Sequence, residues 1–479
     1  MAQDTLSSGT ATEAFLTKLR ERLALRRANF IVAQDADTLR LKTMKTQLSA
    51  LGSVPEEGSE SEDIASRRTA LNAEIQTLNA PRIRAKEAFE RADGLIREID
   101  VALSAQQAAN LMRLGPSPLD IRIWPPAMGQ LVEALQAVSS SVSTAWNTPV
   151  VREKTRNNLP VILSLLLAAG LLITQGRRWM GRVPLTFNSA ESPYANKFAA
   201  YLRSLGQLVI AILSLYLLAH AWDTSRLHDN NLALLLEHAI WIVAPFFGSR
   251  WMAKQLFPLD ALTRSPLPLQ AVLRPRARLI THWLGFVVSV QVLMGYLRDT
   301  NDFNNGTIAV YTFILVLIAS ASTFRLGMMI WKNTAGNPED LSIAKARNQL
   351  VTRLGQALVA VSVISFGLAL VGYSDAADAL LFSSLLSAGL LAVLFVTFEA
   401  VRDLCAMLAS NEASGHDGLT AVVINAILIL VSLPVFALIW RARVSQLTEL
   451  WTQFKTGVTL GDVQLSPGAV LELIIVFVI

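Results

Sequence analysis

Residues 307–324 read Thr-Ile-Ala-Val-Tyr-Thr-Phe-Ile-Leu-Val-Leu-Ile-Ala-Ser-Ala-Ser-Thr-Phe, a stretch of 18 residues without a charged side chain. An α-helix rises about 1.5 Å per residue and the hydrocarbon core of a bilayer is about 30 Å thick, so this stretch predicts a membrane-spanning helix. Seven more spans are predicted on the same grounds: Leu159–Thr174, Leu205–Trp222, Leu232–Phe247, Leu279–Tyr296, Leu354–Val371, Ala377–Phe398 and Leu419–Trp440. The chain is therefore predicted to be all-α, with an eight-span membrane region in residues 151–440.

A ninth apolar stretch, Ala469–Ile479, reaches the end of the chain without a polar stop. We expect it to be the start of a further span whose membrane domain continues beyond Ile479. The connecting residues 441–468 are predicted to form a linker between the eighth and ninth spans.

Charge divides the chain into two parts. The whole chain is 52% hydrophobic and 16% charged, against about 25% charged residues in soluble domains. Residues 1–150 nevertheless hold 18 of the 37 acidic and 17 of the 42 basic side chains. This part has the charge density of a soluble domain, whereas the remainder is far below it.

Residues 1–150 are predicted to form a coiled-coil-like helical hairpin or small bundle. One seven-residue spacing of apolar side chains, interrupted at Asp37, includes Leu16, Leu23, Phe30, Met44 and Leu51. A second helix is expected from Ser61 to about Leu114, with a kink or a new start at Pro81. A third, amphipathic helix is expected over Met128–Val142.

The sequence contains no motif that is typical of an enzyme active site or of a metal site. Cys405 is the single cysteine, which excludes a disulfide scaffold, and the five histidines are scattered. No Gly-rich phosphate loop, His-Glu-x-x-His motif or nucleophile elbow is present. We therefore expect no catalytic residues, no cofactor, no bound metal and no nucleic-acid partner, since membrane topology accounts for the net charge of +5.

The distribution of Lys and Arg predicts the orientation. Alternate loops carry 17 basic residues on the side reached after the first span and 5 on the other side. Cytoplasmic loops are enriched in Lys and Arg, so residues 1–150 are expected outside, in the periplasm of a bacterium with the protein in the inner membrane. Ala2-Gln3-Asp4 after Met1 resembles a mature N-terminus left by a removed signal peptide, in agreement with this side.

An ionisable side chain at the depth of the bilayer core costs free energy, so its presence there indicates a structural or functional role. Glu237 and His238 fall within the third predicted span. One interpretation is a proton or substrate relay. The other is hydrogen bonding between helices or a shallower segment, because adjacent residues point about 100° apart on a helix and cannot form one site together.

Three further patterns bear on packing and lipid contact. Gly367, Gly372, Ser383 and Ser387 indicate close helix packing. Arg274, Arg276 and Arg278 are candidate contacts for anionic lipid headgroups, with plain positive-inside bias as the alternative. Leu447, Leu450, Trp451 and Phe454 follow the i, i+3, i+4, i+7 spacing of a short amphipathic helix. This helix is expected to lie in the membrane interface, or else to pack on protein.

Taken in order, these features resemble a known family. The residues that carry the resemblance are Gly115-Pro116-Ser117-Pro118-Leu119, Trp124-Pro125-Pro126, Leu450-Trp451, Gly457-Val458-Thr459-Leu460-Gly461 and Leu465-Ser466-Pro467-Gly468. The chain resembles the N-terminal part of a large bacterial mechanosensitive channel of the small-conductance (MscS) family, in particular MscK-like members with an uncharacterised N-terminal periplasmic domain.

The resemblance implies a homo-oligomeric channel, with seven subunits, that opens under bilayer tension and protects against osmotic stress. The eight helices of residues 151–440 would form a paddle around the pore, and residues 469–479 would begin the channel core. The pore and the cytoplasmic vestibule would lie beyond Ile479. Membrane lipids are the expected partners, and the sequence identifies no periplasmic partner.

Two alternatives of other classes stay open. One is a secondary transporter that uses Glu237 and His238. The other is a membrane-anchored sensor or scaffold whose residues 1–150 bind partners in the cell envelope.

Overall fold

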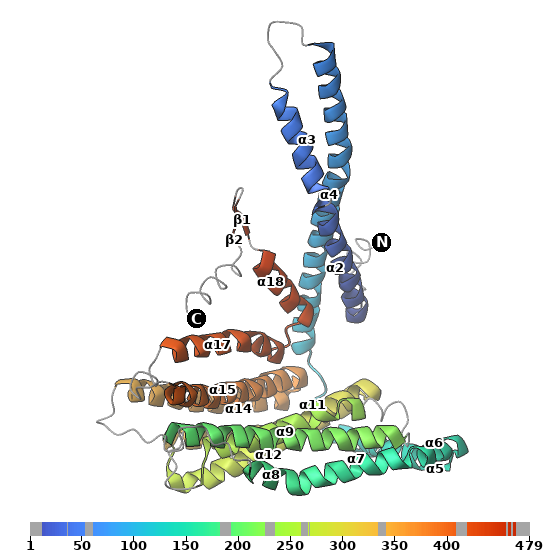
Figure 1. Ribbon diagram of the computed structural model, residues 1–479. Helices are drawn as coiled ribbons and strands as arrows, with labels where there is room; N and C mark the ends of the chain where they lie inside the picture. Colours follow the sequence, from blue (N-terminus) through green and yellow to red (C-terminus); the bar gives the residue numbers. More distant parts are fainter. Residues whose placement is uncertain are drawn as a thin grey trace. The chain divides into compact units, whose positions relative to one another are not determined.

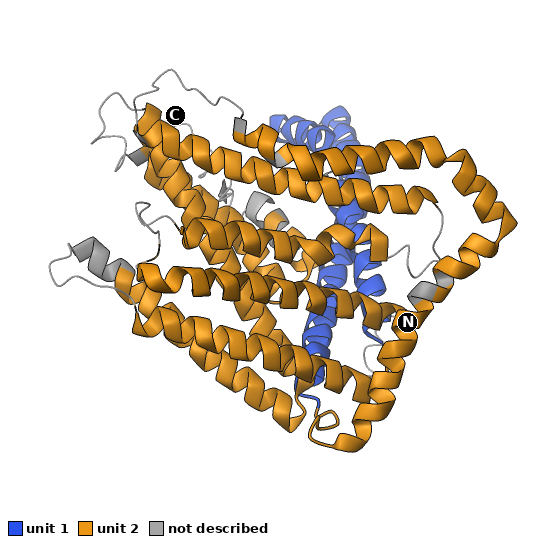
Figure 2. Ribbon diagram, turned by 90° about the horizontal axis from the view of Figure 1, so that it is seen from below, with its two compact units in different colours: residues 1–113 blue, residues 114–479 orange. Residues whose placement is uncertain are grey.

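The computed structural model describes residues 12–35, 37–52, 61–182, 193–225, 235–259, 267, 269–333, 342–408, 419–456, 458–460 and 463–465. The described chain is helical apart from one short antiparallel pair of strands, β1 (Val458–Leu460) and β2 (Val463–Leu465). It divides into two compact units, Met1–Arg113 and Leu114–Ile479 (Figure 2). The amphipathic helix predicted in the linker is thus in place and the two short strands were not predicted, whereas residues 466–479, including the predicted ninth span, lie outside the described residues.

The first unit is an antiparallel helical hairpin. Two shorter helices, α2 (Glu13–Asp35) and α3 (Thr38–Ala50), pack in turn along the long helix α4 (Glu62–Leu111) (Figure 1). The break between α2 and α3 lies at Asp37, whose φ of 58° is left-handed, and it coincides with the interruption of the seven-residue spacing. Helix α4 runs through Pro81, so no new helix starts there.

Apolar packing and ion pairs hold the hairpin together. Leu16, Ile99 and Leu103 form its buried centre. Arg20 pairs with Asp100 at 2.7 Å, and Arg27 pairs with Asp93 at 2.6 Å further along. In α3 the buried side chain is Leu41 rather than the predicted Met44, because the turn at Asp37 shifts the phase of the helix face.

The second unit contains the membrane helices. Its elements before the first long loop are the 3₁₀ turn η1 (Ile121–Ile123), α5 (Trp124–Asn147), α6 (Pro149–Asn157), α7 (Leu159–Leu171), the π turn η2 (Leu172–Gly176) and α8 (Arg177–Arg182). The elements that follow are α9 (Pro193–Ser225), α11 (Ala239–Leu256), the 3₁₀ turn η3 (Ala271–Leu273), α12 (Arg274–Thr300), α13 (Asn305–Lys332), α14 (Ser342–Val371), α15 (Ser374–Leu408), α17 (Leu419–Ile439) and α18 (Val444–Thr456).

Seven helical segments among the described residues are long and apolar enough to cross a membrane, which is the layout of a multi-pass membrane protein. They are Leu159–Gly181, Tyr194–Ser225, Ala271–Thr300, Asn305–Lys332, Asn348–Val371, Ser374–Leu408 and Thr420–Ile439. Each overlaps one of the eight predicted spans. The predicted span Leu232–Phe247 has no counterpart in this set, because the helix in that region, α11, begins at Ala239 and continues through polar residues to Leu256.

Helices α11 and α12 nevertheless pair antiparallel along the length of α11. The ring of His238, just before α11, lies 4.5 Å from the ring of Tyr296 near the end of α12. Further along, the backbone N–H of Phe246 donates to Ser289 Oγ at 3.1 Å. The register continues to Gly285, where the side chain of Ser249 occupies the space that a Cβ would need.

The closest helix crossing joins α13 and α14. A Cβ at Gly355 would lie 2.8 Å from the backbone nitrogen of Trp331 and 3.0 Å from the carbonyl oxygen of Gly327. Glycines at both positions therefore let the two backbones touch, which is how helices associate in a bilayer without a hydrophobic driving force. The predicted packing glycine Gly367 has no neighbour within 4 Å of a built Cβ, so that interpretation was wrong for this position.

Residues 114–147 pack with the second unit, although the sequence analysis grouped them with residues 1–150. The backbone N–H of Gly115 donates to the carbonyl of Gly372 at 3.0 Å, and Ser117 Oγ donates to the carbonyl of Leu370 at 3.1 Å. Gly372 has a φ of 111° and a built Cβ would lie 2.8 Å from Gly115 O, so the corner between α14 and α15 requires glycine. On α5, the amide oxygen of Gln130 accepts a hydrogen bond from Thr307 Oγ1 at 2.6 Å.

We predict that Arg20→Ala weakens the hairpin by about 2–4 kcal/mol, because it leaves the partly buried carboxylate of Asp100 without its partner. The side chains of Arg20 and Asp100 are 4% and 22% exposed. The matched control is Arg40→Ala, since Arg40 and Glu74 are 61% and 42% exposed and such pairs contribute about 0–1 kcal/mol. Hydrogen exchange is measured for peptides from α2 in Arg20→Ala and from α3 in Arg40→Ala, together with the facing peptides of α4 in both; equal losses of protection in the two variants would contradict the prediction.

We predict that Gly355→Ala lowers the stability of the chain in detergent by about 1–3 kcal/mol, because the new methyl group forces α13 and α14 apart. Gly367→Ala adds the same group where a built Cβ has free space, and is expected to be neutral or stabilising by up to about 1 kcal/mol. The unfolding midpoint of each purified variant provides the comparison. A loss of stability in Gly367→Ala as large as in Gly355→Ala would show that the close crossing is not the cause.

Candidate functional site

A tight turn follows the last candidate span and precedes α18. Arg441 has a left-handed φ of 63°, and the backbone N–H of Ala442 donates to the carbonyl of Ala437 at 2.9 Å. The N–H of Arg441 donates to the carbonyl of Leu438 at 3.0 Å. This is the hydrogen-bond pattern of a Schellman turn, in which glycine is the usual residue at the left-handed position. A residue with a Cβ adds about 1–2 kcal/mol of strain there, so other contacts must hold Arg441 in place.

The carboxylate of Asp378 on α15 supplies the main contact. Arg441 Nη2 lies 2.9 Å from Asp378 Oδ2, and Gln291 Nε2 on α12 donates to Asp378 Oδ1. The side chain of Asp378 is 17% exposed. Both carboxylate oxygens therefore have partners, as a largely buried carboxylate requires.

Two serines of α15 bind the same end of α17. Ser383 Oγ donates to the carbonyl of Ile439 at 2.9 Å, and Trp440 Nε1 donates to Ser387 Oγ at 3.0 Å. These are the predicted packing serines, one turn apart on the same face of α15. We call this set, Asp378, Ser383 and Ser387 with residues 439–441, the α17 clamp.

A second, more exposed ion pair lies at the same ends of α12 and α15. Arg298 Nη1 is 3.3 Å from Asp375 Oδ1, with both side chains at least one-third exposed. The end of α12, the start of α15 and the end of α17 are thus joined by charges. Among the described residues, no group of three or more His, Cys, Asp or Glu side chains is arranged to hold a metal ion.

Helix α18 begins directly after the clamp. The backbone N–H of Arg443 donates to Gln446 Oε1 at 3.2 Å, which caps the first turn. Leu447 is half-buried and Trp451 is 58% exposed. The predicted helix is therefore present with Trp451 on an open face, while the side chains of Leu450 and Phe454 lie outside the described part of the structure.

Glu237 and His238 are not brought into one site. The structure places them before the first residue of α11, at a helix end rather than in the middle of a span. Glu237 is exposed, and His238 is half-buried against Tyr296. Their location differs from the prediction because α11 starts later in the sequence than the apolar run Leu232–Phe247.

The three candidate lipid-contact arginines occupy the first turns of α12 and have different surroundings. Arg274 Nε donates to the carbonyl of Leu269 at 3.3 Å, so this side chain is bound to the segment that leads into α12. Arg276 is exposed and Arg278 is half-buried. Of the three, Arg276 is the one that is open to a headgroup at the surface.

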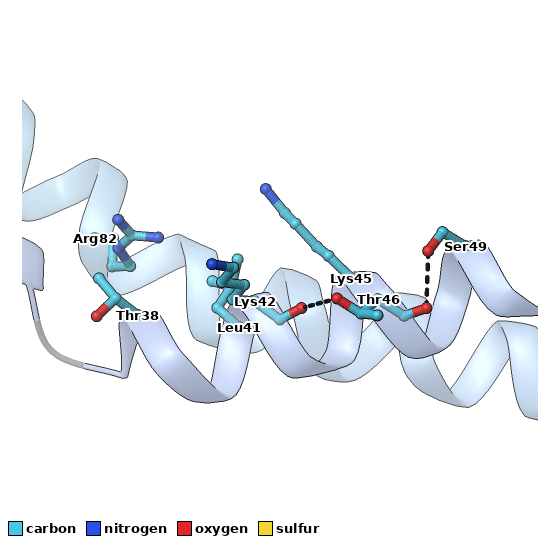
Figure 3. Close-up of a pocket in the computed structure, with 7 residues that line it drawn as sticks. All are labelled: Thr38, Leu41, Lys42, Lys45, Thr46, Ser49 and Arg82. Carbon is cyan, nitrogen blue, oxygen red and sulfur yellow. Dashed lines mark hydrogen bonds between the residues drawn. The ribbon is translucent and has the colours of Figure 1, made fainter. Parts of the chain in front are cut away.

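The first unit has an open basic hollow of about 460 Å³ beside α3 (Figure 3). Lys42, Lys45 and Arg82 line it, and Lys45 extends away from the helices. The hydroxyl of Thr46 donates to the carbonyl of Lys42, and that of Ser49 to the carbonyl of Thr46, so both are used within α3. The hollow is as open as a solvated helix face and is not an enclosed site.

The α17 clamp was not predicted from the sequence. One signal was present: Asp378 falls within the predicted span Ala377–Phe398, and Arg441 directly follows Leu419–Trp440. The start of one span and the end of the next lie on the same side of the membrane, so opposite charges there favour an ion pair. The contribution of Gln291 depends on the packing of α12, which no local pattern reveals.

One family model matches part of the chain. It is described as a protein of unknown function, DUF3772, and matches residues 82–144, from the second half of α4 through Gly115-Pro116-Ser117-Pro118 to most of α5. No curated protein and no solved structure matches the chain. The match therefore identifies a recurring segment that joins the two units, and it assigns no activity.

We predict that Asp378 and Arg441 are energetically coupled. Asp378→Ala should lower the unfolding midpoint of the purified chain, whereas Arg441→Gly combines the loss of the ion pair with relief of strain in the turn. A double-mutant cycle, in which the relief of strain cancels, should give a coupling of about 1–3 kcal/mol. Glycine at 441 retains the turn while removing the charge, which separates the ion pair from the backbone.

The same cycle on Arg298→Ala and Asp375→Ala is the matched control, expected to give less than about 1 kcal/mol because that pair is exposed. Additive effects of Asp378→Ala and Arg441→Gly would rule out the proposed role of the ion pair in the clamp.

Proposed function

We propose that this chain is the N-terminal, peripheral part of a tension-gated ion channel of the MscS type, similar to MscK-like members of that family. On this proposal its membrane helices form a paddle beside a pore built from residues beyond Ile479. The full protein is a homo-oligomer, with seven subunits, in the bacterial inner membrane.

The unequal burial of the spans is the observation that carries this proposal. In its most apolar stretch, α13 has 56% of its residues buried, whereas the corresponding figures are 6% for Tyr194–Ser225 and 0% for Thr420–Ile439. Tension favours the state that occupies more membrane area, and a ligand or force shifts an equilibrium only through a difference between the two states. Spans with few protein contacts can change their tilt at a modest cost in free energy. The membrane area of the protein can therefore differ between two states.

We infer that α11 is an eighth span. It is 18 residues long, or about 27 Å at 1.5 Å per residue, and it pairs antiparallel with the candidate span α12 from His238 to Ser249. With eight crossings, the end of α17 lies on the same side of the membrane as the first unit. The excess of Lys and Arg in the opposite loops makes that side the periplasm.

The α17 clamp gives the paddle a route to the channel core. A change in the tilt of α12 or α15 acts on Arg441 through the Asp378 carboxylate, and α18 begins three residues later. Trp451 is on the open face of α18, and the sequence spacing of Leu447, Leu450, Trp451 and Phe454 is that of a helix that lies in the membrane interface. Lipid headgroups at Arg276, with Arg274 and Arg278 beside it, would anchor the opposite end of α12.

The geometry lends less support to the alternatives. A transporter relay needs its groups at membrane depth, whereas Glu237 is exposed and stands at a helix end. An envelope sensor or scaffold would use the first unit alone, and the described contacts of that unit are those of a self-contained hairpin.

We predict that the full-length gene product, recorded by patch clamp in a host without other mechanosensitive channels, conducts in response to suction. Trp451→Ala should shift the tension threshold, because it removes the side chain that holds α18 in the interface. Trp222→Ala is the matched control: Trp222 is also exposed, but it lies near the end of α9 rather than on the helix that follows the clamp, so the threshold should stay unchanged.

The absence of any suction-activated current from a folded, membrane-inserted protein would overturn the channel proposal. Current with an unchanged threshold in Trp451→Ala would leave the channel standing and remove the coupling role of α18. Uptake of a solute that Glu237→Gln abolishes would instead establish the transporter.

A further inference from the structure

A cavity of about 530 Å³ lies between α11, α12 and α13. Its wall is mainly aromatic and aliphatic, formed by Phe246, Leu279, Trp283 and Phe286. Polar groups also face it: His282 on α12, and Ser322 and Arg325 on α13. An apolar hollow with a few converging polar groups is the usual form of a ligand site.

The polar end of the cavity has two groups available to a ligand, the ring nitrogen Nε2 of His282 and the guanidinium of Arg325. His282 Nε2 is buried and has no hydrogen-bond partner among the described residues, while the ring has a hydrogen bond to the backbone of Arg250. The charges of Arg250, Arg278 and Lys254 act on the same ring. None of the ion pairs among the described residues involves Arg325. An arginine that lines an apolar cavity without a paired carboxylate favours a negatively charged occupant.

The apolar end of the cavity opens outward. Leu279, Trp283 and Phe286 are exposed, and the rings of Trp283 and Phe286 stack with centroids 5.3 Å apart. They belong to a candidate span, so their exposed faces meet lipid chains rather than water. This position excludes a site built only for a small soluble anion.

The depth of the polar groups matches a lipid headgroup. Arg325 stands seven residues before the end of α13, or about 10 Å, and His282 eight residues after the start of α12, or about 12 Å. One leaflet of hydrocarbon is about 15 Å thick, so the long Arg325 side chain can reach the phosphate level from this depth. Both helix ends carry the Lys and Arg excess that marks the cytoplasmic face.

We propose that this cavity binds one phospholipid with an anionic headgroup from the cytoplasmic leaflet. Arg325 holds the headgroup phosphate, His282 Nε2 accepts a hydrogen bond from a headgroup hydroxyl, and an acyl chain lies along Trp283 and Phe286. The site differs from the surface arginines Arg274 and Arg276, which do not line the cavity. It requires only that α11, α12 and α13 lie in a bilayer, so it stands or falls separately from the channel proposal.

Quenching of Trp283 by brominated lipids tests the site in the whole chain. The protein is reconstituted in phosphatidylcholine vesicles that contain a small fraction of brominated phosphatidylglycerol or brominated phosphatidylcholine. The difference between wild type and Trp283→Phe isolates the Trp283 signal from the other tryptophans. We expect the anionic lipid to be about fivefold more effective, the factor that corresponds to about 1 kcal/mol for one Arg near the surface.

Variants then assign the preference to the cavity. Arg325→Gln should abolish the fivefold preference and Arg325→Lys should retain part of it. Arg353→Gln is the matched control and should leave the preference unchanged. Arg353 is an exposed arginine in the N-terminal half of α14, and it does not line the cavity.

Equal quenching of Trp283 by the two brominated lipids in the wild-type chain would overturn the proposal without any variant. An equal loss of preference in Arg325→Gln and Arg353→Gln would also overturn it, since general attraction of anionic lipid to the cytoplasmic face would then be sufficient.

Discussion

A bilayer offers no water to backbone or side-chain polar groups, and this constraint determines the second unit. Each candidate span is a helix because a helix satisfies its own backbone hydrogen bonds. Side chains must find partners in the same way, and they do so mainly near the helix ends. The carboxylate of Asp378 illustrates the result, since it joins Gln291 of α12 to Arg441 beyond α17 and stabilises a turn that would otherwise favour glycine.

The same constraint explains why packing is so uneven. Lipid chains are as apolar as leucine, so helices gain from association only where their surfaces fit closely. Gly327 and Gly355 provide that fit at the centre, and α13 and α14 touch there through their backbones. Without such pairs, α17 keeps its apolar surface open. A rigid centre and a loosely held periphery thus coexist in one unit.

The sequence predicted the features that depend on local pattern. Runs without charge identified seven spans, the seven-residue spacing predicted the hairpin, and its interruption coincided with the break at Asp37. Predictions were less accurate where contacts between residues far apart in the sequence determine the structure. Helix α11 begins later than the run around Leu232 and extends past it, because Trp251 and Leu256 are buried against other helices. The α17 clamp needed three-dimensional proximity between α12, α15 and residues 439–441, which no spacing along the chain contains.

Gly115 is the second residue of the second unit, and its hydrogen bond to Gly372 is the first inter-helix attachment that the chain makes after the hairpin. Any pull on the hairpin is therefore delivered at the corner between α14 and α15, before it can reach α5 or the first span. That corner belongs to the best-packed part of the protein, and Asp375 and Asp378 follow Gly372 within the first turns of α15. In mechanical terms, the point of application of an external load and the attachment of the outgoing helix α18 share one short stretch of chain, residues 372–378.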